Sequence, residues 1–368
     1  TEAGSLASWI AAATSYANLG VPMVPFFTFY SMFGFQRVGD LIWSAADSRA
    51  RGFLMGATAG RTTLAGEGLQ HQDGHSLVLA STVPACQAYD PAFAYELGSI
   101  INYGLQEMYG PDGGTDVFYY IAIYNENYDM PAQADHIGDR DIVSGLYKWA
   151  DAPQAARQAT ILFSGPAHAA ARAAHAELAE HYDVGASIWS ATSYKRLRED
   201  ALEAERWNRL HPEAPPRIAD VAAKLGQSEG PIVAVTDYMT SVPDQISRWA
   251  PRRFTPLGTD GYGRSDTREA LRSFFEVDMP HVVVAVLAGL AADGEIEASA
   301  VADAISRYGI EPDTPNPYTY DIEPTRRGAA GFCSAASSAG RGPGGPAAQG
   351  LASYTMLNGV SATRAKLA

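Results

Sequence analysis

The stretch of this sequence densest in glycine and polar residues carries two histidines four positions apart. His71 and His75 stand in the segment Gly66-Glu-Gly-Leu-Gln-His-Gln-Asp-Gly-His75. An imidazole exchanges protons near neutral pH, and glycine lets a loop come close to a ligand. We therefore consider the segment a candidate ligand loop, although a solvated loop with incidental histidines has the same spacing. A metal pair is a weaker hypothesis, because no third ligand is close in sequence.

Other candidates for chemistry have simpler explanations. Glu2 comes just before the first predicted helix, where the helix dipole favours a carboxylate, so capping is the default explanation. Tyr30, Phe33 and Phe35 crowd the end of a predicted strand, and such aromatics belong to a core more often than to a cofactor platform. The glycine-rich residues 258–265 lack the lysine and the register of nucleotide-binding loops. The absence of a Gly-x-Ser-x-Gly motif argues against a serine hydrolase.

The elements that must position these residues alternate between helical and strand-like patterns. Periodic apolar residues predict helices, and continuous apolar runs predict strands that are buried on both faces. In the first half we predict helices over residues 5–17, 31–51 and 91–109, strands over residues 21–30, 52–56, 77–82 and 117–123, and a turn-rich loop over residues 59–76. In the second half we predict strands over residues 160–164, 186–191 and 231–236, and helices over residues 166–181, 242–249 and 297–308. This alternation is typical of parallel sheets with helices on both faces, so we predict two α/β domains that divide within residues 148–156.

Length, charge and cysteine content argue against several kinds of protein. The 368 residues suffice for two domains, and 46% hydrophobic with 18% charged residues argues against long disorder. A net charge of −14 would repel a phosphate backbone, so we expect no nucleic-acid partner. No apolar run reaches the roughly 18 residues of a membrane span, so we expect no membrane association. Cys86 and Cys333 are too few for a disulfide framework and suit a reducing cytoplasm.

The two ends of the chain differ from the rest. The chain begins with Thr1 and not with methionine, so we expect that an upstream stretch is missing. Residues 326–368 hold five basic residues and no acid, and Gly, Ala, Ser and Pro dominate them. Such a composition buries little apolar surface, so we expect this tail to be disordered.

Several longer stretches resemble one family of enzymes. They are Glu2-Ala-Gly-Ser-Leu-Ala-Ser-Trp9, Tyr30-Ser-Met-Phe-Gly-Phe-Gln-Arg37, Gly60-Arg-Thr-Thr-Leu-Ala-Gly-Glu-Gly-Leu-Gln-His71-Gln-Asp-Gly-His75, Asn125-Glu-Asn-Tyr128 and Gly258-Thr-Asp-Gly-Tyr-Gly-Arg-Ser-Asp266. They make residues 2 to about 317 similar to the homodimeric pyruvate dehydrogenase subunit of bacteria, a transketolase-like family that uses thiamine diphosphate. The residues after Pro317 have no counterpart in that family, and the family's N-terminal diphosphate-binding domain is absent from this sequence.

The resemblance implies a thiamine-diphosphate-binding, transketolase-like α/β fold. Residues 1–150 would form the pyrimidine-binding domain without its start, and residues 151–325 the transketolase C-terminal-like domain. Members of the family are homodimers whose active sites lie between the pyrimidine domain of one subunit and the diphosphate domain of the other. The resemblance therefore places the ligands of Mg²⁺ and of the diphosphate outside this chain, and implies no metal ligand within it.

The resemblance also implies a role for each candidate residue. Glu2 would hydrogen-bond N1′ of the pyrimidine ring, so that the cofactor's own 4′-amino group can remove the C2 proton of its thiazolium ring. Phe33 would stack on the pyrimidine, with Tyr30 beside its amino group. His71 would bind the pyruvate-derived adduct or move protons. Asp73 and His75 would support the loop that carries His71.

The activity implied by the resemblance is oxidative decarboxylation of pyruvate, with transfer of the acetyl group to the lipoyl domain of a dihydrolipoyl acetyltransferase component. Three alternatives remain open at this point. Transketolase-like ketol transfer would need a basic cluster for sugar phosphates, which so acidic a chain does not obviously have. The second alternative is another 2-oxo acid as the substrate, and the third is a role of the chain in dimerisation and assembly only.

Overall fold

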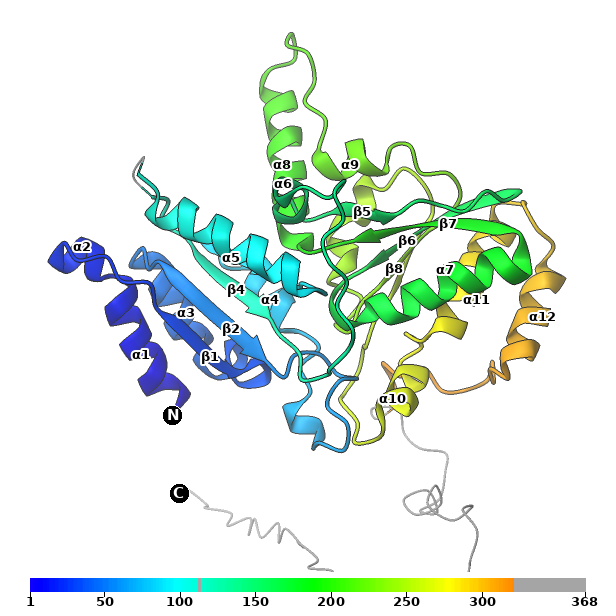
Figure 1. The fold of residues 1–368 in the computed structure, drawn as a ribbon, viewed down its shortest axis with the longest axis horizontal. Helices are drawn as coiled ribbons and strands as arrows, with labels where there is room; N and C mark the ends of the chain where they lie inside the picture. Colours follow the sequence, from blue (N-terminus) through cyan, green and yellow to red (C-terminus); the bar gives the residue numbers. More distant parts are fainter. Residues whose placement is uncertain (112–113, 321–368) are drawn as a thin grey trace, which may run out of the picture. The chain divides into compact units, whose positions relative to one another are not determined.

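Runs of aliphatic and aromatic residues form the strands of two sheets in the computed structural model, which describes residues 1–111 and 114–320 (Figure 1). We call residues 1–143, around the first sheet, the N-lobe, and residues 147–320, around the second sheet, the C-lobe. All strand pairs but one are parallel, so the predicted α/β class with parallel sheets is confirmed. The tail that we predict to be disordered, residues 326–368, lies outside the described residues.

The N-lobe sheet has four parallel strands in the order β1-β2-β4-β3. They are β1 (Phe26–Tyr30), β2 (Gly52–Ala57), β3 (Cys86–Tyr89) and β4 (Phe118–Ala122). The central strands β2 and β4 are buried nearly throughout, as their continuous apolar sequences predict. Since the strands are parallel, their carboxyl ends meet at one edge, where the loop that carries His71 leaves β2.

Side chains of the central strands alternate between two layers of helices. Leu54 and Tyr120 join the apolar cluster that includes α1, α3 and α4, whereas Phe53 and Tyr119 join the cluster of α5 and α6. The predicted helices on both faces are therefore present. Their bounds are α1 (Glu2–Ala13), α2 (Ser15–Leu19), α3 (Phe35–Asp47), α4 (Ser76–Ser81), α5 (Ala94–Tyr109) and α6 (Asp139–Val143).

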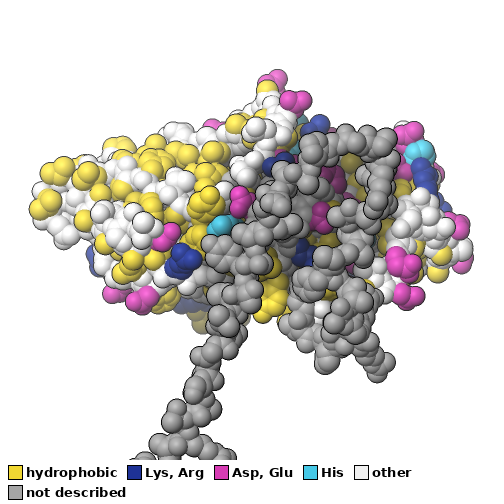
Figure 2. All heavy atoms as spheres, turned by 90° about the horizontal axis from the view of Figure 1, so that it is seen from below, with side chains coloured by type: hydrophobic (Ala, Val, Ile, Leu, Met, Phe, Trp, Pro, Cys, Tyr) yellow, Lys and Arg dark blue, Asp and Glu magenta, His cyan; other side chains and the backbone are white. Residues whose placement is uncertain are grey.

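The first strand is less buried than its sequence predicts. We predict a strand over residues 21–30 that is buried on both faces, but β1 begins at Phe26 and only Phe29 within it is buried. The reason is position, since β1 has a neighbour on one side only. The preceding residues add exposed apolar side chains, namely Leu19, Val21, Met23 and Val24. Figure 2 shows hydrophobic side chains gathered on the side where α1, α2 and β1 lie in Figure 1.

Two further predictions fail in the segment between the ligand loop and α5. Of residues 77–82, predicted as a strand, residues 77–81 belong to helix α4, and the strand β3 has no counterpart in the prediction. A residue that precedes the helix stabilises its first turn. The buried Asp73 carboxylate accepts the backbone N–H groups of His75 and Ser76 at 3.0 and 2.9 Å. Periodicity cannot distinguish a short apolar helix from a strand.

The C-lobe sheet has five strands in the order β5-β7-β6-β8-β9, of which only β5 is antiparallel to its neighbour. The predicted strands over residues 160–164, 186–191 and 231–236 overlap β6, β7 and β8, and the predicted helices over 166–181 and 297–308 overlap α7 and α12. The helix predicted over residues 242–249 is a 3₁₀ helix, η4 (Pro243–Trp249). The strands are β5 (Tyr147–Ala150), β6 (Arg157–Phe163), β7 (Val184–Ser190), β8 (Ile232–Val235) and β9 (Phe254–Leu257); the helices are α7 (His168–Tyr182), α8 (Tyr194–Leu210), α9 (Asp220–Leu225), α10 (Arg268–Phe274), α11 (Met279–Ala292) and α12 (Ala298–Tyr308).

The stretch from Arg268 to Ala292 has the length and the mean hydropathy of a membrane-crossing helix. It consists of two helices, α10 and α11, and the Asp278 carboxylate caps the second by accepting the backbone N–H of His281 at 3.2 Å. The apolar residues of α11 lie in the C-lobe core against α7 and β8, with Val282, Val286, Leu287 and Leu290 buried. Its hydropathy therefore has an explanation in core packing.

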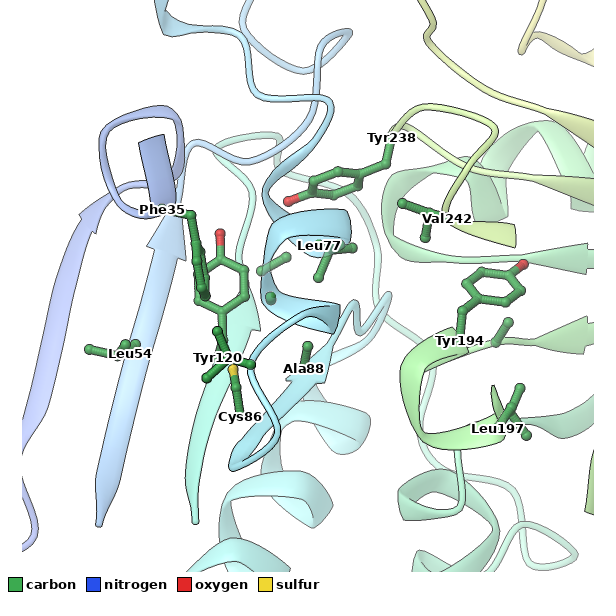
Figure 3. Packing of buried hydrophobic residues seen from close by; sticks show 14 of the residues in the cluster. Phe35, Leu54, Leu77, Cys86, Ala88, Tyr120, Tyr194, Leu197, Tyr238 and Val242 are labelled. Carbon is green, nitrogen blue, oxygen red and sulfur yellow. The ribbon is translucent and has the colours of Figure 1, made fainter. Parts of the chain in front are cut away.

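One buried apolar cluster includes residues of both lobes (Figure 3). Leu77 and Tyr120 of the N-lobe belong to it together with Tyr194, Tyr238 and Val242 of the C-lobe. The predicted division within residues 148–156 falls close to β5, whose residues Tyr147–Ala150 already pair with β7 in the second sheet. The domain roles of residues 1–150 and 151–325 stay predictions.

Candidate functional site

The candidate ligand loop leaves β2 and turns back on itself against the C-lobe. Gly60 pairs with Asp73 in an antiparallel bridge, which closes the loop at its base. Gly60 has a φ of +80°, and a Cβ atom there would lie 2.0 Å from an Asp237 carboxylate oxygen. The buried Arg61 side chain donates to the Thr259 carbonyl of the C-lobe. The base of the loop is therefore fixed by contacts with C-lobe residues that follow β8 and β9.

Asp73 lies at this buried base. Besides capping α4, its carboxylate accepts the hydroxyl of Ser76. The Asp73 side chain is fully buried, so its oxygens serve the loop and helix and are not open to a ligand.

His75 is held between two polar partners. Its Nε2 lies 2.6 Å from Nε2 of Gln36, whose amide nitrogen can only donate, so the imidazole accepts there and is neutral. Its Nδ1 faces the Asp73 carboxylate at 3.8 Å. Burial lowers the pKa of His75, and the nearby Asp73 charge opposes that shift. His75 therefore links the loop to the start of α3.

His71 lies at the tip of the loop, in the short 3₁₀ helix η2 (Leu69–His71), and is turned toward the aromatic residues after β1. Its ring centre is 5.3 Å from that of Phe33 in an edge-on arrangement and 5.6 Å from that of Tyr30. Its Nδ1 lies 3.2 Å from a carboxylate oxygen of Glu67. The structure thus brings together Tyr30, Phe33 and His71, which are up to 41 positions apart in sequence.

Glu2 reaches the same region from the start of α1. This helix is anchored by the buried Leu6 and Trp9, and the Trp9 indole donates to the Phe53 carbonyl at 3.1 Å. The Glu2 side chain remains partly exposed. The pKa of Glu2 is lowered, mainly by a hydrogen bond from its own backbone N–H and further by the Thr1 ammonium and Arg37; slight desolvation opposes this.

Arg37 connects Glu2 with the aromatic residues, and the sequence analysis assigned it no role. Its guanidinium carbon lies 3.8 Å from the centre of the Phe33 ring, and its Nη1 lies 3.9 Å from Oε2 of Glu2. The spacing of four positions from Phe33 could have suggested the contact, since residues so spaced lie on one side of a helix. We call Glu2, Tyr30, Phe33, Arg37 and His71 the open cluster. Its aromatic faces and its carboxylate suit a flat heteroaromatic ring with a hydrogen-bonding edge.

Three buried carboxylates, which no sequence pattern indicated, lie where the lobes meet. Asp90 accepts the Ser164 hydroxyl at 2.6 Å, and Asp237 accepts the backbone N–H groups of Arg61 and Thr62 at 3.1 and 3.2 Å. Glu96 accepts the Ser190 hydroxyl at 2.6 Å.

Burial dominates the ionisation of all three acids. It raises the pKa of Asp90 to about 7 and that of Asp237 to about 6, and it raises the pKa of Glu96 as well. Each accepts a hydrogen bond between the lobes, so we call them the carboxylate junction. No local pattern in the sequence indicates them, because their partners are 74 to 176 positions away.

The metal-pair hypothesis for His71 and His75 finds no further ligand. Among residues 1–111 and 114–320, no group of three or more His, Cys, Asp or Glu side chains could hold a metal ion. The two imidazoles face different partners, Glu67 and Gln36.

Comparisons with known proteins match both lobes. Residues 1–131 match the family model of the pyruvate dehydrogenase E1 component middle domain, and residues 145–278 match that of the transketolase-like C-terminal domain. The pyruvate dehydrogenase E1 component of Pseudomonas aeruginosa is 51% identical over 318 residues, which are 86% of this chain and 36% of that protein. That of Escherichia coli is 48% identical over 317 residues, 86% of this chain and 35% of that protein.

Solved structures agree on the fold. Transketolase from Campylobacter jejuni superposes with a TM-score of 0.56 at 14% identity, over 76% of this chain and 38% of that one. A split-gene transketolase, described as an inactive β4 tetramer, superposes with a TM-score of 0.55 at 17% identity, over 79% of this chain and 82% of that one.

The two sheets and these matches define the class of the chain, a pair of transketolase-like α/β domains. Within that class the chain is a relative of the pyruvate dehydrogenase E1 components, and it spans about a third of the length of the curated relatives that it matches. The resemblance drawn from the sequence motifs is thereby confirmed.

Proposed function

We propose that this chain supplies the pyrimidine-binding and C-terminal domains of a thiamine-diphosphate-dependent enzyme that oxidatively decarboxylates pyruvate and transfers the acetyl group to a lipoyl domain. The observation that carries the proposal is the open cluster. Residues from three separate segments, around Glu2, Phe33 and His71, meet there, and the middle-domain family model covers all three. About half of the matched residues are identical in relatives that bear the name of this enzyme.

The open cluster fits the pyrimidine end of the cofactor. A flat ring needs an aromatic face to stack on and a hydrogen-bonding group at its edge, and Phe33 and Glu2 offer these two features on either side of one guanidinium. When bound, thiamine diphosphate supplies the nucleophilic thiazolium carbon and an electron sink. The protein supplies position and electrostatics.

Each residue of the cluster has a definite task in this proposal. Glu2 hydrogen-bonds the ring nitrogen N1′, Phe33 stacks on the ring, and Tyr30 lies beside the amino group. His71 faces the same aromatic residues and carries protons for the substrate, because its imidazole is partly exposed and its Nδ1 has a carboxylate neighbour in Glu67. Mg²⁺ and the diphosphate are held by groups other than the described residues.

The proposed partners follow from the same assignment. The working enzyme is a cytoplasmic homodimer that meets the lipoyl-bearing dihydrolipoyl acetyltransferase component. The exposed apolar side chains before and along β1 are available for contacts with further protein.

Ketol transfer is the less favoured activity. The transketolases share the fold at 14 to 17% identity, whereas pyruvate dehydrogenase E1 components share 44 to 51% of the aligned residues. An assay of ketol transfer between sugar phosphates separates the two activities.

One comparison favours a second role, in assembly alone. The split-gene transketolase chain has nearly the extent of this one, and it is described as an inactive β4 tetramer. A chain with this role would associate with other subunits without lending catalytic groups to them.

A chimeric enzyme tests the proposed function. The matching third of the Pseudomonas aeruginosa E1 component is replaced by the aligned residues of this protein, and pyruvate-dependent acetylation of a lipoyl domain is measured. We expect activity, and we expect Glu2→Gln in the chimera to lower turnover by roughly two to four orders of magnitude, the scale of lost acid–base help.

The parent E1 component with its own glutamate replaced serves as the control. A folded chimera that binds its partners but does not acetylate would favour the assembly role. Near-normal turnover of the Glu2→Gln chimera would remove Glu2 from the mechanism.

A further inference from the structure

The Arg37 guanidinium contacts both Phe33 and Glu2, the two residues that the proposed function assigns to the cofactor ring. Its carbon lies over the Phe33 ring at 3.8 Å from the ring centre, and its Nη1 is 3.9 Å from the Glu2 carboxylate. Because both contacts belong to one planar group, that group lies on the side of Phe33 that faces Glu2. A pyrimidine ring stacked on Phe33 with an edge on Glu2 needs the same space.

The chemistry of the two groups is closely matched. A guanidinium is planar, stacks on aromatic faces and presents N–H donors to a carboxylate. An aminopyrimidine is also planar, stacks in the same way and turns a hydrogen-bonding edge toward an acid. One site with an aromatic face and a carboxylate therefore accepts either group.

A second arginine of this protein shows what a fixed cation–π contact looks like. Arg51 lies over Tyr16 at 4.0 Å, but its guanidinium also donates to the Met108 and Gly114 carbonyls at 2.7 Å and to Asp116. Its side chain is 14% exposed, against 57% for Arg37. Among the described residues, the Arg37 guanidinium has no hydrogen-bond partner. Hydrogen bonds hold the Arg51 side chain in place, whereas the Arg37 side chain can rotate into solvent at a small cost in free energy.

We propose that Arg37 occupies the pyrimidine subsite of this protein and is displaced when the cofactor ring binds. The inference rests on the proposed function, because it takes Phe33 and Glu2 as the ring's contacts. Arg37 is then a positioning residue that covers the Phe33 face and pairs with the Glu2 carboxylate until the ring arrives. The exchange moves no covalent bond; one planar group replaces another.

Nuclear magnetic resonance on the 368-residue protein tests the displacement directly, with thiamine itself as the probe. In the free protein, the Phe33 ring current should shift the Cδ protons of Arg37 upfield. Titration with thiamine should move the Phe33 ring signals and, in step, return the Arg37 protons to ordinary positions. The Arg51 signals, shifted by Tyr16, should stay unchanged. Persistence of the Arg37 shift while Phe33 responds would overturn the inference, because Arg37 would then support the opposite face of the ring.

Three variants add a second, independent measurement. Arg37→Met keeps the aliphatic stem but removes the cation, so we expect it to bind thiamine about two- to fivefold more tightly, the fold-change that corresponds to one exposed cation–π contact. Arg37→Lys, which keeps the charge but not the flat guanidinium, should fall between Met and wild type. Phe33→Leu should abolish binding.

The possible failures are distinguishable. Equal or weaker binding by Arg37→Met contradicts the displacement while leaving the cofactor site in place. If thiamine moves no Phe33 signal in wild type or in Arg37→Met, the proposed cofactor site fails, and the inference fails with it.

Discussion

The pKa values of acidic side chains are shifted in opposite directions in the open cluster and in the carboxylate junction. Glu2 of the cluster is partly exposed, and hydrogen bonding and nearby cations lower its pKa. Asp90 of the junction is buried, and burial raises its pKa to about 7 despite two hydroxyl donors. The comparison teaches where this protein is rigid and where it is adjustable. Hydrogen bonds among buried groups hold the lobes together, while the groups of the open cluster keep weak, exchangeable contacts.

Substitutions in the two regions test this contrast. If it is right, changes in the carboxylate junction and at the buried base of the loop alter the free energy of unfolding. Changes in the open cluster alter ligand binding and leave stability nearly untouched.

The largest effect on stability is expected at Asp73. Asp73→Ala removes the acceptor of two backbone N–H groups and of the Ser76 hydroxyl, all buried, so we expect a loss of about 3–5 kcal/mol in the free energy of unfolding. Denaturation in urea measures it.

His71→Ala, two positions away, is the matched control. Its side chain is partly exposed, so the unfolding midpoint should stay close to that of the wild type, while steps that involve the pyruvate adduct weaken in the chimeric enzyme. A loss at His71 equal to that at Asp73 would remove the distinction between tip and base of the loop.

The next effect is a pH dependence that comes from Asp90. Its pKa is raised from 3.8 to about 7 by burial, so between these values the folded protein holds a proton that the unfolded chain releases. Stability then falls as pH rises from about 4 to about 7, by at most roughly 4 kcal/mol from this group. Asp90→Asn cannot ionise, so its unfolding free energy should decline less over that range.

Urea unfolding of both proteins at several pH values gives the comparison. Asp237 and Glu96, whose pKa values are also raised, remain in the variant and keep part of the slope. Parallel profiles for wild type and Asp90→Asn would contradict the raised pKa, because they would mean that Asp90 has the same pKa in the folded and the unfolded protein.

Two glycines of the ligand loop allow a finer comparison of how much the base and the outer part of the loop contribute to stability. Both Gly60 and Gly66 have positive φ, +80° and +72°, but a Cβ at Gly60 would collide with Asp237, whereas one at Gly66 meets nothing within 4 Å. We expect Gly66→Ala to cost about 1 kcal/mol and Gly60→Ala about 2–4 kcal/mol in unfolding free energy. Thermal unfolding of the two variants measures the difference. Equal costs would mean that the loop base is free to move away from the C-lobe.

Some long elements could be predicted from sequence, but the helices α8 and α11 were not predicted although they have 17 and 14 residues. Helix α5 and strand β4 carry enough periodic or continuous apolar residues to be recognised alone. The helix α4 depends on Asp73, a cap outside its own pattern, and the exposure of β1 depends on which strand lies beside it. Both features depend on tertiary contacts, which the local sequence pattern does not contain.

The candidate site was predictable to a similar extent. Motif resemblance pointed to Glu2, Tyr30, Phe33 and His71, and the structure places their segments together; their roles stay predictions. Arg37 was missed although it stands in one of the quoted motifs. Asp90, Glu96 and Asp237 were missed because burial and distant partners give them their properties, and neither can be seen along the chain.

The most direct test of the account compares two ligands on the unmodified 368-residue protein. The open cluster offers a ring face and one acid, and the described residues offer no metal-binding group, so the diphosphate should add little. We predict that thiamine and thiamine diphosphate with Mg²⁺ bind with similar dissociation constants on the order of millimolar, and that Phe33→Ala abolishes both. Equilibrium titration followed at the proton signals of the ligand, which can be observed with both the wild type and the variant, provides the measurement. Micromolar binding of thiamine diphosphate with Mg²⁺, unaffected by Phe33→Ala, would contradict the account, because the cofactor would then be held elsewhere on this chain.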